Sequence, residues 1–360
     1  MLQYKPNAAE AIGRLSRLFE RRAPDEIFAT IGVPSAALAD FQQRYPEGFC
    51  AYPDPVERIA FWDRLLAERA ALEDDSIPSA YLSEMDQGLY GGVLGGAAQF
   101  MSHPDTGWIS SMVAPLLADL AELDRLKFDR SGEWFRRYQR QLDVFAAGAA
   151  GKFGVSHFIL IDGLNFVFEL IGATATYLAL DVCPEQVRRA IDFAYDLNVA
   201  IQETFFERAG LLAGGTASNM VGWLPGRIVS ESVDPFHMTS VAYFEQWGRA
   251  PAERILGHFD GGVVHIHGNG RHLLEAVATL RGLKAMFLGD DRGYPAAFDV
   301  LPDLQARTGD LPLVVQADYA PFVERLRRHA LPGGVLYHVR GAPTIAAANS
   351  LMDEVRAYRR

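Results

Sequence analysis

The sequence predicts an α/β protein, and in particular a single (β/α)8 barrel with extra N-terminal helices. Short apolar runs alternate with helical stretches in the second half of the chain, at residues 262–268, 283–291, 311–318 and 334–341. Each connector between them is about long enough for one helix. Strands that are apolar throughout are typical of a parallel sheet buried on both faces. Such repeats build a barrel or an open doubly wound sheet, and we favour the barrel because no G-x-G-x-x-G turn follows a first strand.

The first 75 residues have a different pattern, which predicts helices. Residues 7–22 and 54–75 carry apolar side chains at helical spacing, and Asp54 followed by Pro55 is a typical helix start. We therefore expect residues 1–75 to be a helical extension that packs on the flank of the barrel. The barrel itself is expected to span residues 76–360.

Composition limits the partners that this chain can have. Its formal net charge is −11, which disfavours binding to nucleic acid or to anionic lipid. Two cysteines, Cys50 and Cys183, are too few for a disulfide framework or a four-cysteine zinc site. The sequence has no apolar signal core and no run of ~18 apolar residues. We expect a cytoplasmic enzyme that acts on a small molecule without a membrane partner, and a homodimer is left open.

Polar residues follow nearly every apolar run, at the ends where barrels of this class carry their chemistry. The opposite ends, such as Leu283 and Pro312, carry none. This asymmetry predicts a catalytic face, although Asp and Ser after a strand also cap helices. The polar residues are Asp162, Ser230, Glu231, Ser232, His265, His267, Asp290, Asp291, Gln316, Asp318, His338 and Arg340.

Two histidines, His265 and His267, stand two residues apart at the end of one of these runs. Residues at this spacing on a strand point to the same side. Neutral imidazoles bind Zn²⁺ well, but a catalytic zinc needs a third protein ligand. The available ligands are His338, His237 or a carboxylate such as Asp318. Without a metal, the pair would bind substrate carboxylates or act as acid and base near neutral pH.

Four segments in order resemble the uroporphyrinogen decarboxylase superfamily, which includes cobalamin-dependent methyltransferases. The segment "VVHIHGNG" is similar to the family's H-x-C-G-N motif, with His267 in place of the cysteine. The stretch "DQGLYGGVLG" is similar to D-I-L-x-x-P-x-A-L-G and begins at Asp86. The resemblance covers about residues 78–360 and implies the barrel fold. The four segments are residues 159–196, 229–247, 263–290 and 334–358.

The resemblance implies a set of site residues. In the decarboxylases, the Asp of this motif stabilises positive charge on a tetrapyrrole, and this role passes to Asp86. Catalytic roles are expected for Asp86, His265 and His338, and a zinc ion would be held by His265, His267 and His338. Substrate-binding roles are expected for Ser232, Asp162, Arg340 and Asp318. The arginine-rich N-terminal loop of the decarboxylases has no counterpart here, and Phe168 stands near their active-site tyrosine.

Two functions follow from these residues. The first is a methyltransferase-like enzyme that carries out corrinoid- or thiol-linked methyl transfer, with zinc and a corrinoid bound by a partner protein. The second is a metal-free decarboxylase or lyase, which acts on a tetrapyrrole-like or other carboxylated small molecule and needs no cofactor. A binding module without activity is a third interpretation, and the polar strand ends argue against it.

Overall fold

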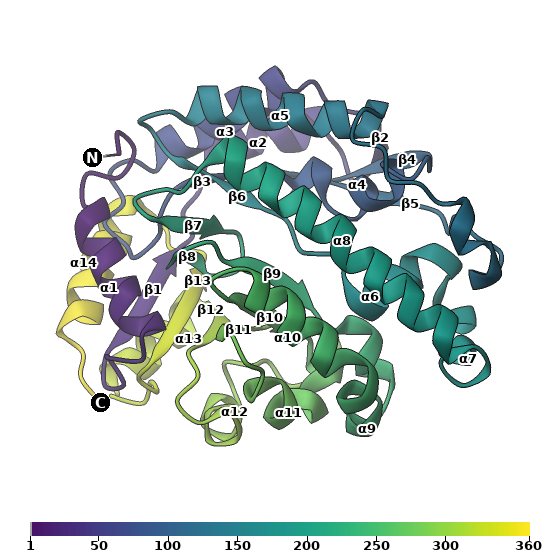
Figure 1. Cartoon of the computed structure of the whole chain (residues 1–360). Coiled ribbons are helices and arrows are strands. Elements are labelled where there is room, and N and C mark those ends of the chain that lie inside the picture. The colour runs from purple at the N-terminus through teal and green to yellow at the C-terminus, as the bar shows by residue number, and fades with distance from the viewer. Residues whose placement is uncertain (1) are drawn as a thin grey trace.

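A computed structural model describes residues 2–360, and it is organised around a central parallel sheet of six strands (Figure 1). The strand order is β1-β13-β12-β11-β10-β9, and all neighbouring pairs are parallel. This sheet confirms the predicted α/β class. The strands are β1 (Ile27–Ile31), β9 (Val229–Ser232), β10 (Gly262–Ile266), β11 (Leu283–Leu288), β12 (Leu313–Asp318) and β13 (Val335–Arg340).

A second sheet has the order β3-β6-β7-β8, in which β3 (Ser79–Tyr81), β6 (Gly154–His157) and β7 (Gly215–Ser218) are parallel and β8 (Gly222–Pro225) is antiparallel. An isolated parallel bridge between Ile159 and Ser230 joins the two sheets. The amide of Leu160 donates to the carbonyl of Ser230 at 2.8 Å. The central sheet and this second sheet are therefore linked, and closure into a barrel stays a prediction.

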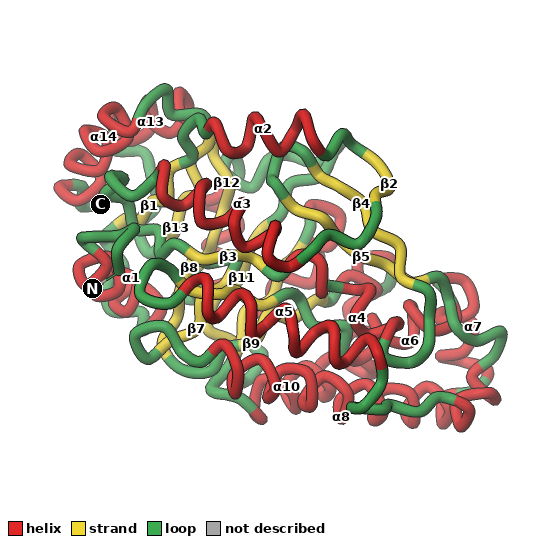
Figure 2. The backbone as a smooth tube through the Cα atoms, turned by 90° about the horizontal axis from the view of Figure 1, so that it is seen from above, coloured by secondary structure: helices red, strands yellow, loops and turns green. Residues whose placement is uncertain are grey.

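Helices lie around these strands, and α3, α5 and α8 run next to one another in contact (Figure 2). A small antiparallel sheet of β2 (Gly48–Cys50), β4 (Ala98–His103) and β5 (Trp108–Val113) lies beside them. The helices are α1 (Ala8–Phe19), α2 (Ala36–Arg44), α3 (Pro55–Glu68), α4 (Gln87–Gly92), α5 (Glu133–Ala149), α6 (Gly163–Ile171), α7 (Ala173–Val182), α8 (Pro184–Ala209), α9 (Val241–Tyr243), α10 (Arg249–His258), α11 (Leu274–Ala278), α12 (Leu301–Thr308), α13 (Tyr319–Arg327) and α14 (Ile345–Ala357).

The N-terminal segment needs one correction, because it is not only helical. The two predicted helices are present as α1 and α3, and Asp54 caps α3 through the amide of Val56. Between them, however, β1 pairs in parallel with β13 along its whole length. Its apolar residues are buried in the core of the central sheet rather than on one face of a helix. The division of the chain at residue 75 stays a prediction.

Two buried acids hold the free edge of β1. Asp74 Oδ2 accepts a hydrogen bond from the amide of Ile31 at 2.6 Å, and Asp75 Oδ2 accepts one from the amide of Ala29 at 2.9 Å. Each carboxylate has a buried cationic partner. Lys5 Nζ lies 2.7 Å from Asp74, and Arg14 Nε lies 2.6 Å from Asp75. These side chains take over the bonds that a neighbouring strand would otherwise make.

No helix among residues 2–360 is by itself long and apolar enough to cross a membrane. The helices α6 and α7 meet these criteria only when taken together, and they are bent by 116° at their junction.

Removal of the Arg14 guanidinium tests the buried ion pair. The substitution Arg14→Met leaves the buried carboxyl of Asp75 without its partner, and we expect the free energy of unfolding to fall by about 3–5 kcal/mol. The matched control is Arg21→Met, which breaks the exposed pair with Asp310 and should cost less than about 1 kcal/mol. Denaturation curves of both variants measure the difference. Equal losses in the two variants would show that the buried pair does not hold β1.

Candidate functional site

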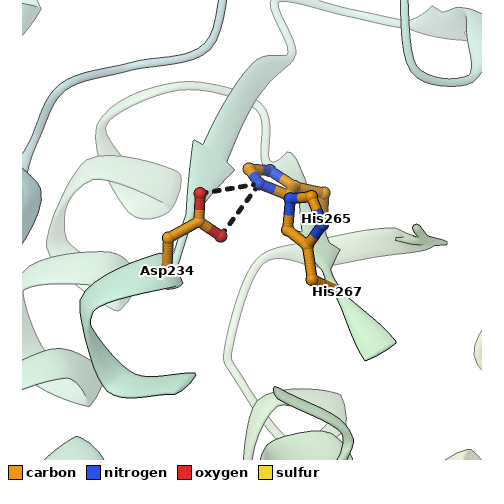
Figure 3. A group of neighbouring side chains, drawn as sticks. All are labelled: Asp234, His265 and His267. Carbon is orange, nitrogen blue, oxygen red and sulfur yellow. Dashed lines mark hydrogen bonds and ion pairs between the residues drawn. The ribbon is translucent and has the colours of Figure 1, made fainter. Parts of the chain in front are cut away.

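Three side chains at the carboxyl end of the central sheet form a compact group. One ligand atom from each of Asp234, His265 and His267 lies within 4.8 Å of the others. Figure 3 shows the carboxylate of Asp234 facing His265, with His267 next to it. The two imidazole rings are 5.1 Å apart between centroids, so they lie on the same side of the strand, as predicted from their spacing.

The position of Asp234 follows from the pairing of two strands. Ser232, the last residue of β9, lies opposite His265 of β10 in the parallel register. The chain then turns into a short 3-10 helix (Asp234–Met238), and the amide of Asp234 donates to Ser232 Oγ at 3.2 Å. This turn places the carboxylate of Asp234 at 3.0 Å and 3.1 Å, through its two oxygens, from His265 Nε2.

The three histidines around Asp234 keep it ionised. Burial alone would raise its pKa, but the hydrogen bond and charge of His265, with the charges of His237 and His267, lower the pKa to about 2. Asp234 is therefore a carboxylate at neutral pH, which is the form that binds cations.

A second carboxylate orients His267. Asp291 Oδ1 lies 3.0 Å from His267 Nδ1, and Asp291 Oδ2 accepts a hydrogen bond from the amide of Asn269 at 3.3 Å. The contact with Asp291 occupies Nδ1 of His267 and leaves Nε2 as the nitrogen available to a ligand. Metal-binding histidines commonly donate their other ring N–H to a carboxylate in this way.

A fourth imidazole, His237, lies against the group. Its Nδ1 is 3.6 Å from Asp234 Oδ1, and its ring centroid is 5.8 Å from that of His267. Burial lowers the pKa of His237 to about 4, so its ring is neutral at neutral pH. The close approach requires a glycine at position 270, because a Cβ there would lie 2.1 Å from His237 Cδ2.

The donor set fits a divalent transition metal. One carboxylate and two imidazoles are the three protein ligands of a catalytic zinc site, which keeps a position open for substrate. Two histidines with one carboxylate also suit Fe²⁺. Two buried atoms at this place, His265 Nδ1 and His237 Nε2, have no hydrogen-bond partner in the protein. Asp234, His265 and His267 would hold the ion, with His237 beside them.

His338 does not belong to this group, which corrects the predicted set of three histidines. Two strands, β11 and β12, separate β13 from β10. Both ring nitrogens of His338 are engaged, Nδ1 with Thr30 Oγ1 at 2.6 Å and Nε2 with the carbonyl of Met220 at 2.8 Å. Since a carbonyl only accepts, Nε2 carries the proton and is not free for a metal. Asp234 supplies the third ligand instead.

The residues predicted to bind substrate are spread over several places. Asp318 and Arg340 lie in register on β12 and β13 and form an exposed ion pair at 3.0 Å. Ser232 is buried and bonded to the amide of Asp234, so it positions that residue. Asp162 is buried at the start of α6 and lines a cavity beside α8 and α10. Their roles in substrate binding stay predictions.

Asp86 follows the carboxyl end of β3, and His265 and His267 stand at the carboxyl end of β10. These residues therefore lie at the same end of the parallel strands. Its Oδ1 accepts hydrogen bonds from the amide of Ser111 at 2.8 Å and from Ser111 Oγ at 2.9 Å. Burial raises the pKa of Asp86 to about 7, against the lowering effect of these bonds. The carboxyl can therefore gain or lose a proton near neutral pH, as a general acid or base requires.

Sequence reasoning missed Asp234 as a ligand. It identifies Ser230, Glu231 and Ser232 as strand-end residues but does not include Asp234, which stands two residues after Ser232. The signal was present, because "SESVD" places an acid directly after the strand that neighbours the histidines. Asp291 was identified only as a strand-end residue that can cap a helix, whereas the structure shows it against His267.

Comparison with solved structures shows a fold similar to that of a methyltransferase from Methanosarcina mazei. The TM-score is 0.60 at 12% sequence identity, and the match covers 96% of this chain and 98% of that chain. This likeness over nearly both chains shows a common fold. No protein-family model and no curated protein matches the sequence.

The substitution Gly270→Ala tests the packing of His237. The added methyl group would meet the imidazole at 2.1 Å, so the ring or the 3-10 helix must move. We expect the free energy of unfolding to fall by about 1–3 kcal/mol. In the control Gly257→Ala, on the exposed side of α10 with nothing within 4 Å, the added methyl should be neutral or stabilise by up to about 1 kcal/mol. Denaturation midpoints of both variants provide the comparison, and a Gly270→Ala protein as stable as the control would contradict the contact.

Proposed function

We propose that this protein is a methyltransferase-like enzyme whose reaction takes place at a metal centre held by Asp234, His265 and His267. The observation that carries the proposal is the convergence of these three side chains at the carboxyl end of a parallel sheet. The fold similarity to a methyltransferase supports the same class of reaction. So does the resemblance of "VVHIHGNG" to the H-x-C-G-N motif of the cobalamin-dependent enzymes.

We propose further that eight parallel strands close into a (β/α)8 barrel, with the metal centre at its mouth. These strands are β1, β3, β6 and β9–β13. Two contacts support closure at the junctions between the two sheets. The Ile159–Ser230 bridge links the segment after β6 to β9, and the amide of Asp75, just before β3, donates to the carbonyl of Ala29 in β1 at 2.9 Å. Chemistry at one end of the strands is the rule for this architecture.

The reaction proposed is transfer of a methyl group from a corrinoid to a thiol. A bound Zn²⁺ would supply Lewis acidity, which favours the thiolate form of a substrate at neutral pH. In such a transfer the corrinoid would keep the electron pair of its bond to the methyl group, the substrate thiolate would gain the methyl group on sulfur, and the thiol proton would pass to solvent. Asp291 fixes the ring of His267 during this step, and Ser232 fixes Asp234.

Three residues at or after the carboxyl ends of the strands, Arg340, Asp318 and Asp86, suggest how substrates are held. The ion pair of Arg340 and Asp318 is largely exposed, so the guanidinium is available to a substrate carboxylate. The carboxyl of Asp86 is available to hold or move a proton, since its pKa is near 7. A corrinoid would be delivered by a partner protein that docks over these strand ends.

The alternative is decarboxylation without a metal, and the single observation in its favour is Asp86. A carboxyl with a pKa of about 7 at the end of β3 can stabilise positive charge on an intermediate and then exchange a proton. In that reaction His265 and His267 would bind substrate carboxylates. The two proposals differ in whether activity depends on a metal.

Metal analysis with point variants tests the proposal. We expect about one zinc ion per chain in the protein as purified. His267→Ala should lose it, because two ligands hold zinc poorly. Asp291→Asn should weaken zinc binding by about 10–100-fold through loss of the orienting carboxylate. The control His103→Ala removes an imidazole on β4 that bonds to Ser110 and should leave zinc content unchanged.

Activity is measured on the same proteins. Loss of the carbon–cobalt absorbance of methylcobalamin in the presence of a thiol should require both the metal and His267. Zinc-free protein, or equal zinc in wild type and His267→Ala, would overturn the metal centre. In that case, CO₂ release from a carboxylated tetrapyrrole by metal-free wild type, lost in Asp86→Asn, would favour the decarboxylase.

A further inference from the structure

A cavity of about 280 Å³ lies outside the central sheet, beside α8 and α10. Its walls include the apolar side chains of Ile191 and Pro251 and the rings of Tyr195 and Trp247. Asp162, the residue before α6, also lines it. None of these residues belongs to the group around Asp234, so this cavity is a separate place in the molecule.

The polar feature of this cavity is a buried carboxyl of which one oxygen has no partner. Asp162 is 2% exposed, and its Oδ1 has no hydrogen-bond partner in the protein. Glu231, which lies on β9, is also buried, and its Oε2 has no hydrogen-bond partner in the protein. Burial raises the pKa of Asp162 to about 7. A buried polar atom without a partner is costly, and a ligand with an O–H or N–H group would satisfy it.

Two guanidinium groups line the same cavity. Arg254 lies over the ring of Tyr195 at 3.6 Å and donates through one nitrogen to Asp192. Arg188 lies over Trp247 at 4.9 Å and donates through one nitrogen to Glu185. Each guanidinium keeps further N–H groups for an outside acceptor, and both side chains are about half exposed. The paired N–H groups of a guanidinium recognise carboxylates.

The backbone beside the cavity is itself unusual. Residues Phe244–Gly248 form a turn of π-helix directly before α10, and this turn supplies Gln246 and Trp247 to the cavity. Such π-helical turns are rare and occur frequently at functional sites. The turn is a feature of the backbone, independent of the unpaired carboxyl, and both point to the same cavity.

We propose that this cavity is a binding site for a small aromatic acid that carries a hydroxyl or amino group opposite its carboxylate. The ring would lie among Trp247, Tyr195, Ile191 and Pro251. Its polar group would meet Asp162 Oδ1, and its carboxylate would meet Arg254 and Arg188. This site is independent of the proposed methyl transfer, because it uses none of the metal-centre residues.

Isothermal titration calorimetry of the full-length protein with 4-hydroxybenzoate tests this proposal. We expect a dissociation constant below about 1 mM. Benzoate, which lacks the hydroxyl, should bind at least about tenfold more weakly, because Asp162 is then left unpaired. Arg254→Gln and Asp162→Asn should each weaken 4-hydroxybenzoate binding by at least about tenfold.

Two control variants separate this site from the rest of the molecule. His267→Ala should bind 4-hydroxybenzoate as wild type does, which separates the cavity from the metal centre. Arg208→Gln, on α8 and paired with Asp143, should also bind normally. If Asp162→Asn does not fold, the half-exposed Arg254 still carries the test. The absence of binding to folded wild type, or equal binding by wild type and Arg254→Gln, would overturn the proposal.

Discussion

The register between β9 and β10 is the constraint on which the candidate site depends. Parallel pairing places Ser232 opposite His265, and only this register brings the turn after β9 beside the two imidazoles. A shift by one residue would turn His265 to the other face of the sheet, where apolar side chains pack against helices. Apolar residues of both strands, such as Val229 and Val264, are fully buried in this arrangement.

Buried polar groups that lack a partner lie on β10, on β9 and just before α6. Asp162, Glu231 and His265 are all nearly inaccessible, and each has a polar atom without a partner in the protein. By contrast, the buried acids Asp74 and Asp75 at the edge of β1 are bonded to backbone amides and to cations. The satisfied groups therefore stabilise the sheet, whereas Asp162 and His265 keep unpaired atoms at the two places where we propose that ligands bind.

Sequence patterns predicted the central sheet well and the site in part. The runs around 262–268, 283–291, 311–318 and 334–341 became adjacent parallel strands, since full burial of both faces leaves a continuous apolar run. The pair His265 and His267 could be recognised because side chains two residues apart point to the same face of any strand. β1 was missed because a short apolar run among helical segments has no distinguishing period.

The third ligand could not be derived from spacing. His338 was chosen because it follows an apolar run, but its distance from His265 depends on the order of strands in the sheet. That order puts β9, and with it Asp234, next to β10, and puts β13 two strands further away. The partners of His338, Thr30 and the carbonyl of Met220, come from distant parts of the chain, so their contacts depend on the tertiary fold.

The central claim is that Asp234, His265 and His267 bind one metal ion. X-ray absorption spectroscopy at the zinc edge of the purified full-length protein tests it most directly. The account predicts a first shell of nitrogen and oxygen only, at about 2.0–2.2 Å, with the outer-shell scattering of imidazole from His265 and His267. The bound zinc, and with it this imidazole signal, should be lost in the His265→Ala, His267→Ala double variant. A shell that contains sulfur from the protein, or a spectrum unchanged in that variant, would contradict the claim.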